Sequence, residues 1–324
     1  MRVPEYLTRA IEEASGGSLP ASVAAASREL TQRYRAAKFT TAPIRTAAER
    51  SAYLAARFPA TFAVNVHVFS ELRRRAPQSE IRTLLDLGAG PGTSLFSAAE
   101  VFPELNGATL VEAHAEWTTI WRGMAGLSPH SAVRNAQWVH TDLRDRADFQ
   151  SHDLTVLSYA FGELPSATTE KVLQRAWAST TKFMVLIEPG TRRGFAGVNA
   201  ARSWLIEHGA RILAPCPHHA ACPMAIARDW CHFSQRLERT AEHRRLKGAE
   251  LGYEDEKFSY IVATRLDLPA AQARIVRHPR KHSGHVQLEV CTSNGRIEKR
   301  TITKSNKDAY RRARRAEWGE DWNE

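Results

Sequence analysis

Short runs of apolar residues alternate with helical stretches over the middle of this chain. The runs are TLLDLG (83–88), ATLVEA (108–113), LTVLSYAF (154–161), FMVLIEPG (183–190) and FSYIVATR (258–265). Strands that are buried on both faces have this near-continuous apolar composition, and they occur mainly in parallel sheets covered by helices. The pattern therefore predicts an α/β fold with a mostly parallel sheet.

Residues 1–78 have a different pattern, with apolar positions at helical spacing and no strand-like alternation. The helical spacing runs over 22–39 and 47–72, and Pro43 interrupts it. We expect an N-terminal helical cap here, which ends near residue 78.

Residues 267–324 contain two runs of alternating polarity around Asn294-Gly295. An Asn-Gly pair between two such runs predicts a β-hairpin with a two-residue turn. The predicted organisation is therefore a helical cap over 1–78, an α/β core over 79–266 and a small β element with a tail over 267–324.

The distribution of charge indicates a class of binding partner. The formal net charge of the 324 residues is +10, and residues 296–315 carry a dense basic cluster opposed only by Glu298 and Asp308. Such a cluster favours a polyanion such as nucleic acid, although a solvated helix face is the alternative. The basic residues are Arg296, Lys299, Arg300, Lys304, Lys307, Arg311, Arg312, Arg314 and Arg315.

The overall composition is that of a globular protein, with 43% hydrophobic and 25% charged residues. No stretch approaches the roughly 18 consecutive apolar residues of a membrane span. The first residues lack the apolar core of a signal peptide. We expect a cytoplasmic protein that has no membrane partner.

The segment LLDLGAGPGTSLFSAAE has the strongest local signal for a ligand. It leads from a buried strand through Asp86, Gly88, Gly90 and Gly92 into a helix that starts near Thr93. Glycines let the backbone turn sharply and approach a ligand closely, and the free N–H groups of a helix start favour an electronegative group. The spacing resembles motif I of class I S-adenosylmethionine-dependent methyltransferases. The alternative is a glycine-rich turn that serves packing only.

Two acidic residues lie where this resemblance needs them. Glu112 ends the second predicted strand and suits a bidentate hydrogen bond to ribose hydroxyls. Asp142 follows the third strand and resembles the acid that contacts the adenine amino group. A carboxylate at a strand end also serves as a helix cap, and this alternative stays open for Asp142.

The segment LSYAFGEL (157–164) corresponds to the place where class I enzymes line the transferable methyl group. Tyr159, Phe161 and Glu163 are the candidates for this pocket, although aromatic residues at a strand end are often only core. There is no N-P-P-Y motif and no Pro-Cys nucleophile, so the acceptor atom is unspecified. Methyl transfer depends on positioning and desolvation more than on an acid or base.

The four cysteines of the chain are spaced as one possible ligand set, C-x5-C-x8-C and a distant fourth. Four thiolates make a complete set for zinc or for an iron-sulfur cluster, and the spacing does not choose between them. Unliganded thiols are the alternative. His218, His219 and His232 are weaker candidates as zinc ligands. The cysteines are Cys216, Cys222, Cys231 and Cys291.

These motifs together resemble the small-ribosomal-subunit methyltransferase-like family, which has mitochondrial members. The resemblance rests on D-L-G-A-G-P-G-T, S-Y-A-F-G-E-L, I-E-P-G-T, C-P-H-H-A-A-C-P, D-W-C-H-F and F-S-Y-I-V-A-T-R, and it extends over about residues 53–291. Without a mitochondrial presequence, the chain resembles a bacterial-type relative. The resemblance implies a Rossmann-like class I methyltransferase fold, with a Cys-rich insertion at about 214–234.

The resemblance also implies site residues and a partner. Gly88, Gly90, Gly92 and Glu112 would contact S-adenosylmethionine, and the four cysteines would hold a [4Fe-4S] cluster, with zinc as the alternative. The implied partner is the small ribosomal subunit or its rRNA. We expect a ribosomal RNA methyltransferase, and the alternative is a non-catalytic assembly factor that uses the same fold as an RNA-binding scaffold. A radical enzyme ranks last, because four cysteines would leave no open iron site.

Overall fold

The computed structural model describes the chain except residues 17–20, 37–43, 146–147, 240–243, 245–250 and 324. The expected helical positions 37–39 and Pro43 therefore lie outside the described residues. The chain divides into two compact units. The first unit contains residues 1–70, 80–147 and 235–256, and the second contains residues 71–79, 148–234 and 257–324.

The first unit contains a parallel arrangement of three strands in the order β3-β2-β1. Leu85 pairs with Thr109 and Leu110 pairs with Trp138, so the strands are in continuous register. The apolar runs that predict β1 and β2 form strands that are mostly buried. The strands are β1 (Thr83–Leu87), β2 (Gly107–Glu112) and β3 (Gln137–His140).

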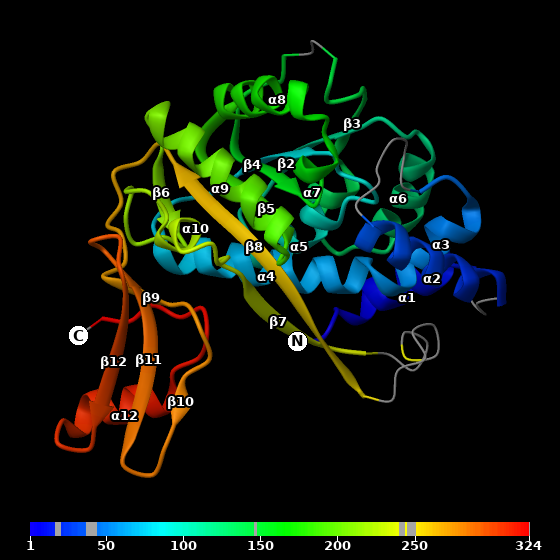
Figure 1. The fold of residues 1–324 in the computed structure, drawn as a ribbon. Coiled ribbons are helices and arrows are strands. Elements are labelled where there is room, and N and C mark those ends of the chain that lie inside the picture. Colours follow the sequence, from blue (N-terminus) through cyan, green and yellow to red (C-terminus); the bar gives the residue numbers. More distant parts are fainter. Residues whose placement is uncertain (17–20, 37–43, 146–147, 240–243, 245–250, 324) are drawn as a thin grey trace. The chain divides into compact units, whose positions relative to one another are not determined.

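Helices account for most of the remainder of this unit. The start of α3 is fixed by a capping box, in which the Thr46 side chain accepts the Glu49 N–H and the Glu49 carboxylate accepts the Thr46 N–H. In Figure 1, α1, α2 and α3 are the blue helices at one end of this unit. The helices are α1 (Glu5–Ala14), α2 (Ala21–Ala36), α3 (Ala47–Ala56), α4 (Phe58–Arg75, whose last turn belongs to the second unit), α5 (Thr93–Val101), α6 (Glu116–Gly126) and α7 (Ser131–Arg134).

The second unit contains a mixed sheet. β4 and β5 are parallel, whereas β8 runs antiparallel to both β5 and β6. The mostly parallel sheet predicted from the apolar runs therefore holds for β4 and β5, and the run at 258–265 has the opposite direction. An antiparallel strand can be fully buried too, so composition alone does not give its direction. The chain has a mixed α/β architecture.

Three helices and a 3₁₀ turn accompany these strands. The strands are β4 (His152–Ser158), β5 (Thr180–Pro189), β6 (Arg211–Ala214), β7 (Phe233–Glu238) and β8 (Tyr253–Thr264). Residues 235–238 of β7 and 253–256 of β8 belong to the first unit. The helices are η1 (Phe161–Glu163), α8 (Ser166–Ala178), α9 (Arg192–Glu207) and α10 (Pro223–Ile226).

The second unit also contains a smaller sheet near the C-terminus. Its strands pair in the order β10-β11-β12, and β9 pairs with β11. Figure 1 shows α12, in red, against this sheet, and Ala313, Ala316 and Trp322 share a buried core with Val286 and Leu288. The elements are β9 (Ala273–Ile275), β10 (Arg280–Lys281), β11 (His285–Thr292), β12 (Ile297–Thr303) and α12 (Lys307–Arg315).

β11 and β12 form a hairpin around Asn294-Gly295, but its turn differs from the predicted two-residue turn. The strands end at Thr292 and resume at Ile297, and the Gly295 N–H donates to the Thr292 carbonyl. A type I′ turn needs positive φ at both central residues. Only Gly295 has it, at φ 70°, so the loop is longer and places the glycine after the turn.

In the described part of the chain, no helix combines the length and the apolar character that crossing a membrane requires.

Candidate functional site

The turn between β1 and α5 is built from glycines in a left-handed conformation. Gly88, Gly90 and Gly92 have φ values of 74°, 53° and 79°, and Gly92 is the N-cap of α5. Other residues rarely adopt these values, so the sequence spacing is a requirement of the backbone here. The helix starts at Thr93, as predicted.

Gly90 and Gly92 have different surroundings in this turn. A Cβ built on Gly92 would lie 2.9 Å from Trp121 Cδ1 and 3.1 Å from Leu110 Cδ2, so this glycine permits close packing. A Cβ built on Gly90 would meet no protein atom within 4 Å. The space beside Gly90 is therefore open to a ligand that approaches the backbone closely.

Glu112 lies at the end of β2, as the sequence predicts, and its carboxylate is directed at the glycine turn. Oε2 accepts the Gly90 N–H at 3.0 Å, and Oε1 accepts the His114 N–H at 2.9 Å. The side chain is held in place by two backbone donors and is buried. A ligand with hydroxyl donors at this position would meet a preoriented carboxylate.

Asp86 is more deeply buried, with only 1% of its surface exposed. Burial raises its pKa to about 7, the neighbouring Glu112 carboxylate raises it further, and a hydrogen bond with Ser94 opposes both. Its Oδ2 has no hydrogen-bond partner among the residues that the structure describes. Asp86 therefore supports the strand end from within the core.

Asp142 follows β3, as predicted, and is engaged locally. Its Oδ1 accepts the backbone N–H and the Nε–H of Arg144, at 2.8 and 2.9 Å. These hydrogen bonds with Arg144 hold the pKa of Asp142 below its usual range. The carboxylate thus stabilises a turn, and a role toward adenine stays a prediction.

In the second unit, the candidate pocket residues follow the end of β4. Tyr159 adopts φ 59°, which costs a non-glycine residue on the order of 1–3 kcal/mol. Phe161 and Glu163 are the ends of the 3₁₀ turn η1, and Phe161 is buried whereas Glu163 is exposed. Strain of this kind persists only where the surroundings fix the backbone.

Glu188, which sequence reasoning did not single out, holds the backbone that follows Tyr159. It is 4% exposed at the end of β5, and its Oε1 accepts the Gly162 N–H at 3.0 Å. Burial raises its pKa to about 7, against the hydrogen bonds from the Gly162 and Phe161 amides. A Cβ on Gly162 would lie 2.6 Å from Oε2, so this approach requires glycine. The I-E-P-G-T motif contains Glu188 but gave no sign of this contact.

The second unit brings all four cysteines to the lining of one small cavity. Cys216 follows β6, Cys222 precedes α10, Cys231 precedes β7 and Cys291 lies in β11. The Ser259 hydroxyl donates to the Cys231 carbonyl at 2.8 Å, which anchors that part of the loop. The distant fourth cysteine and the three clustered ones therefore line the same cavity, and their role as metal ligands stays a prediction.

The cysteines are free thiols in largely apolar surroundings. Burial raises the pKa of Cys291 to about 12 and also raises the pKa values of Cys216 and Cys231. The proximity of the other cysteines raises the pKa of Cys231 and Cys291 further. Thiols that raise one another's pKa lose their protons readily only when a cation binds among them.

Among the three candidate histidines, only His218 lines this cavity. Its Nε2 lies 3.4 Å from Cys291 Sγ, and its buried Nδ1 has no partner in the described part of the chain. His219 Nε2 accepts the Ile212 N–H at 2.9 Å, and the His232 ring stacks on Trp230. His219 and His232 are thus engaged elsewhere.

The donor set has the chemistry of a metal site but not the arrangement for a single ion. Within the described ranges, no group of three or more His, Cys, Asp or Glu side chains is arranged to hold a metal ion. Ligands of a single tetrahedral zinc crowd around one point. In an iron-sulfur cluster each cysteine binds a different iron, and which of the two groups binds here stays a prediction.

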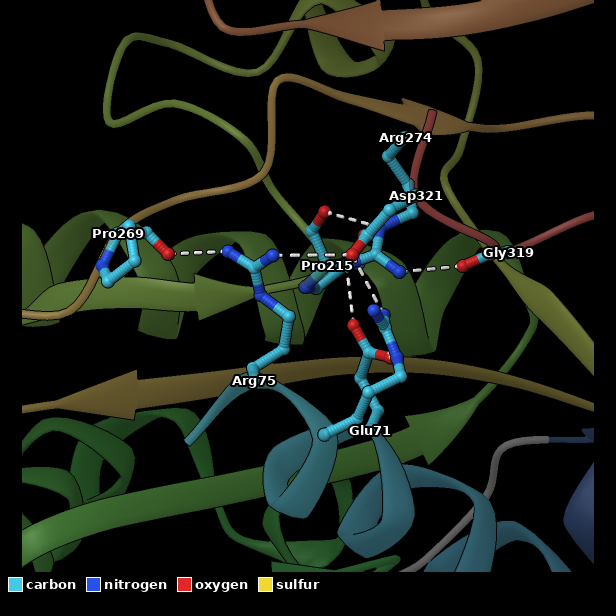
Figure 2. A network of polar contacts seen from close by, with 8 residues as sticks. Glu71, Arg75, Pro215, Pro269, Arg274, Gly319 and Asp321 are labelled. Atoms are coloured by element: carbon cyan, nitrogen blue, oxygen red, sulfur yellow. Dashed lines mark hydrogen bonds and ion pairs between the residues drawn. The ribbon is translucent and has the colours of Figure 1, made fainter. Parts of the chain in front are cut away.

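Two buried arginines also line the cavity, and no sequence pattern predicted either of them. Arg274, in β9, pairs in register with Cys291. Figure 2 shows its guanidinium at the centre of a polar network, with bonds to the carbonyls of Pro215 and Gly319 at 3.0 and 2.7 Å. The same guanidinium forms ion pairs with Glu71 at 2.7 Å and Asp321 at 2.8 Å. Arg202, in α9, is the other arginine.

Comparison with known proteins shows the family of the chain. A family model described as mitochondrial small ribosomal subunit Rsm22 matches residues 47–323. The chain belongs to this family. Among Rsm22-family relatives, human ribosome assembly protein METTL17, mitochondrial, is 27% identical over 287 residues, which are 83% of this chain and 61% of the relative. Ribosome assembly protein RSM22, mitochondrial, of Saccharomyces cerevisiae is 21% identical over 35% of this chain and 28% of its own.

This Rsm22-family chain thus matches less than two thirds of the length of these relatives. Similar solved structures include magnesium protoporphyrin IX methyltransferase from Synechocystis PCC 6803, with a TM-score of 0.41 and 10% identity over 73% of this chain and 91% of that one. Another is the N-methyltransferase NodS from Bradyrhizobium japonicum WM9, with a TM-score of 0.40 and 10% identity over 63% and 87%.

Proposed function

We propose that this chain binds S-adenosylmethionine at the turn between β1 and α5 and methylates RNA of the small ribosomal subunit. The open space beside Gly90 carries the proposal, because it is where a cofactor could approach the backbone. Amides at the start of α5 would face its electronegative groups, and Glu112 would accept its ribose hydroxyls. The bound cofactor would supply the methyl group. The chain's residues would hold and desolvate the acceptor.

The printed names of the human and yeast relatives call both of them ribosome assembly proteins. We extend this association to the chain, with the basic cluster on α12 as its contact with RNA phosphates. Arg311, Arg314 and Arg315 are exposed on this helix. Exposed arginines in series bind phosphates without reading the sequence of the nucleic acid.

The four-cysteine cavity is proposed to hold a [4Fe-4S] cluster, with zinc as the alternative. Cys216, Cys222, Cys231 and Cys291 would be its ligands. Bound there, a cluster would add binding free energy to folding and would tie the loop after β6 to β11. Anaerobically purified protein should contain iron and sulfide in near-equal amounts. Stoichiometric zinc in a colourless protein would support the alternative.

The decisive experiment is the transfer of labelled methyl groups from S-adenosylmethionine to small subunits isolated from cells that lack this protein. Incorporation at one nucleotide is expected with the wild-type chain. Gly90→Asp should abolish it, because the new carboxylate would fill the open space. The matched control is Gly123→Asp, in α6, where a Cβ also meets no atom within 4 Å. It should leave cofactor binding, measured by calorimetry, unchanged.

A non-catalytic assembly factor is the second candidate, and the names of the human and yeast relatives favour it. In this case the protein would bind S-adenosylmethionine and the small subunit without transferring a methyl group. Demonstrated binding of both partners, with no incorporation at any nucleotide, would establish this candidate and exclude the first.

A further inference from the structure

Arg202 is a buried cation in the wall of the four-cysteine cavity, and only 3% of its surface is exposed. Its Nη2 donates to the carbonyls of His218 and Ala220, at 2.7 and 3.0 Å. Its Nε is buried and has no hydrogen-bond partner in the part of the chain that the structure describes. Two carbonyl dipoles orient the guanidinium, but they do not neutralise its charge.

The charge of the other arginine in this wall is neutralised by carboxylates. Arg274 forms ion pairs with Glu71 and Asp321, and Figure 2 shows both carboxylates beside its guanidinium. No described Asp or Glu forms an ion pair with Arg202. A buried charge is strongly unfavourable unless an opposite charge compensates it. A compensating negative charge for Arg202 would have to come from the cavity that it lines together with the four cysteines.

We infer that Arg202 is the counter-ion of an anionic group held by the four cysteines, and that it sets the reduction potential of that group. The inference rests on the proposed [4Fe-4S] cluster. Four thiolates outweigh the charge of the iron-sulfide core, so the filled site is anionic. One-electron reduction adds one more negative charge to the cluster. A buried cation stabilises the reduced form more than the oxidised form, and so raises the potential.

Two substitutions separate the charge of Arg202 from its hydrogen bonds. Arg202→Gln removes the charge and keeps amide donors for the two carbonyls. Arg202→Lys keeps the charge in the same wall. Arg228→Met is the control, because this arginine lies between Cys222 and Cys231 with an exposed side chain, where solvent screens its charge. Arg202 acts through the cysteine site, so it is a positioning residue.

The measurement is a redox titration of the full chain, purified anaerobically and followed by electron paramagnetic resonance of the reduced cluster. Arg202→Gln should lower the potential by about 59 mV or more, which is tenfold in the equilibrium constant for one electron. Arg202→Lys should shift it less, and Arg228→Met should leave it unchanged. Equal shifts in the Gln and Lys variants, or none in the Gln variant, would overturn the counter-ion role.

Cluster retention gives a second measurement if the Gln variant is too unstable to titrate. After reconstitution with iron and sulfide, the decay of visible absorbance in a chelator should be faster for Arg202→Gln than for Arg202→Lys. Equal decay rates would contradict the inference. Wild-type protein without iron and sulfide would instead refute the cluster itself, and with it the inference. Iron analysis therefore distinguishes the two failures.

Discussion

Asp86 and Glu188 are carboxylic acids whose buried surroundings favour the neutral form. Burial raises the pKa of each to about 7. A carboxyl group with a raised pKa binds its proton more tightly in the folded state than in the unfolded state. It therefore stabilises the fold at acidic pH, and this contribution is lost as the pH rises through about 7.

The free energy of unfolding should accordingly fall between about pH 4 and pH 7 because of these two groups. The upper limit is ~4 kcal/mol for Asp86 and ~3 kcal/mol for Glu188. Asp86→Asn and Glu188→Gln should each flatten this dependence, since the amide cannot ionise. Urea denaturation at a series of pH values measures it.

Asp308→Asn is the control for these variants. Its side chain is 89% exposed, so the substitution should leave the pH dependence as it is in the wild type. If the Asp86→Asn variant kept the wild-type pH dependence, the assignment of a buried, raised pKa to Asp86 would be wrong.

At the scale of elements, Arg274 links β9 to the end of α4 and to the segment around Gly319. Arg274→Met should lower the free energy of unfolding by ~3 kcal/mol, because Glu71 and Asp321 would lose their buried partner. Both carboxylates keep contacts with Arg74, which limits the loss.

Arg311→Met is the matched control for Arg274→Met. Arg311 contacts Asp308 at 3.5 Å on the surface, and an exposed pair of this kind contributes little. Chemical denaturation should show no measurable change for this variant. An equal loss of stability in both variants would show that the Arg274 network does not support the fold as described.

α12 makes the proposed RNA contact testable without disturbing its core. Deletion of the helix would remove Ala313 from the core of the small sheet, so substitution of exposed charges is cleaner. Arg311→Gln, Arg314→Gln and Arg315→Gln together should weaken RNA binding and reduce its logarithmic salt slope by about 1 for each phosphate that is no longer bound. An unchanged slope, with thermal unfolding also unchanged, would refute the role of α12.

The elements differ in how far the sequence could predict them. β1 and β2 were predictable from their buried apolar runs, and the turn into α5 was predictable because positive φ values at Gly88, Gly90 and Gly92 demand glycines at fixed spacing. The short strands β9 and β10 were missed, since a few residues carry no period. The turn at Asn294-Gly295 was predicted too short, because only its glycine takes a positive φ.

At the candidate sites, the sequence identified thiols and acids but not the residues that hold them. The cysteines could be grouped by their type and spacing. Glu188, Arg202 and Arg274 could not be found, because a buried charge is recognised only by the partners that folding brings to it. Arg274 depends on Glu71, which lies far from it in the sequence.

At the scale of the whole molecule, the two units should respond differently to loss of the proposed cluster. A chelator of ferrous iron should raise amide hydrogen exchange in residues 216–232 and in β11 by roughly tenfold or more. β1 and α5, in the first unit, should exchange as before. Mass spectrometry of peptides with and without chelator measures this, and an equal change in both units would contradict a local role for the metal.

Because Cys291 lies in a strand far along the chain, it is synthesised after the other three cysteines. A growing chain exposes Cys216, Cys222 and Cys231 before β11 has been made and paired with β9. Earlier segments leave the ribosome and begin to fold first. The first three cysteines are therefore synthesised before the fourth, and the complete set of four thiols comes together only after the small sheet has formed. Binding of the proposed cluster would consequently be a late step in the maturation of the protein.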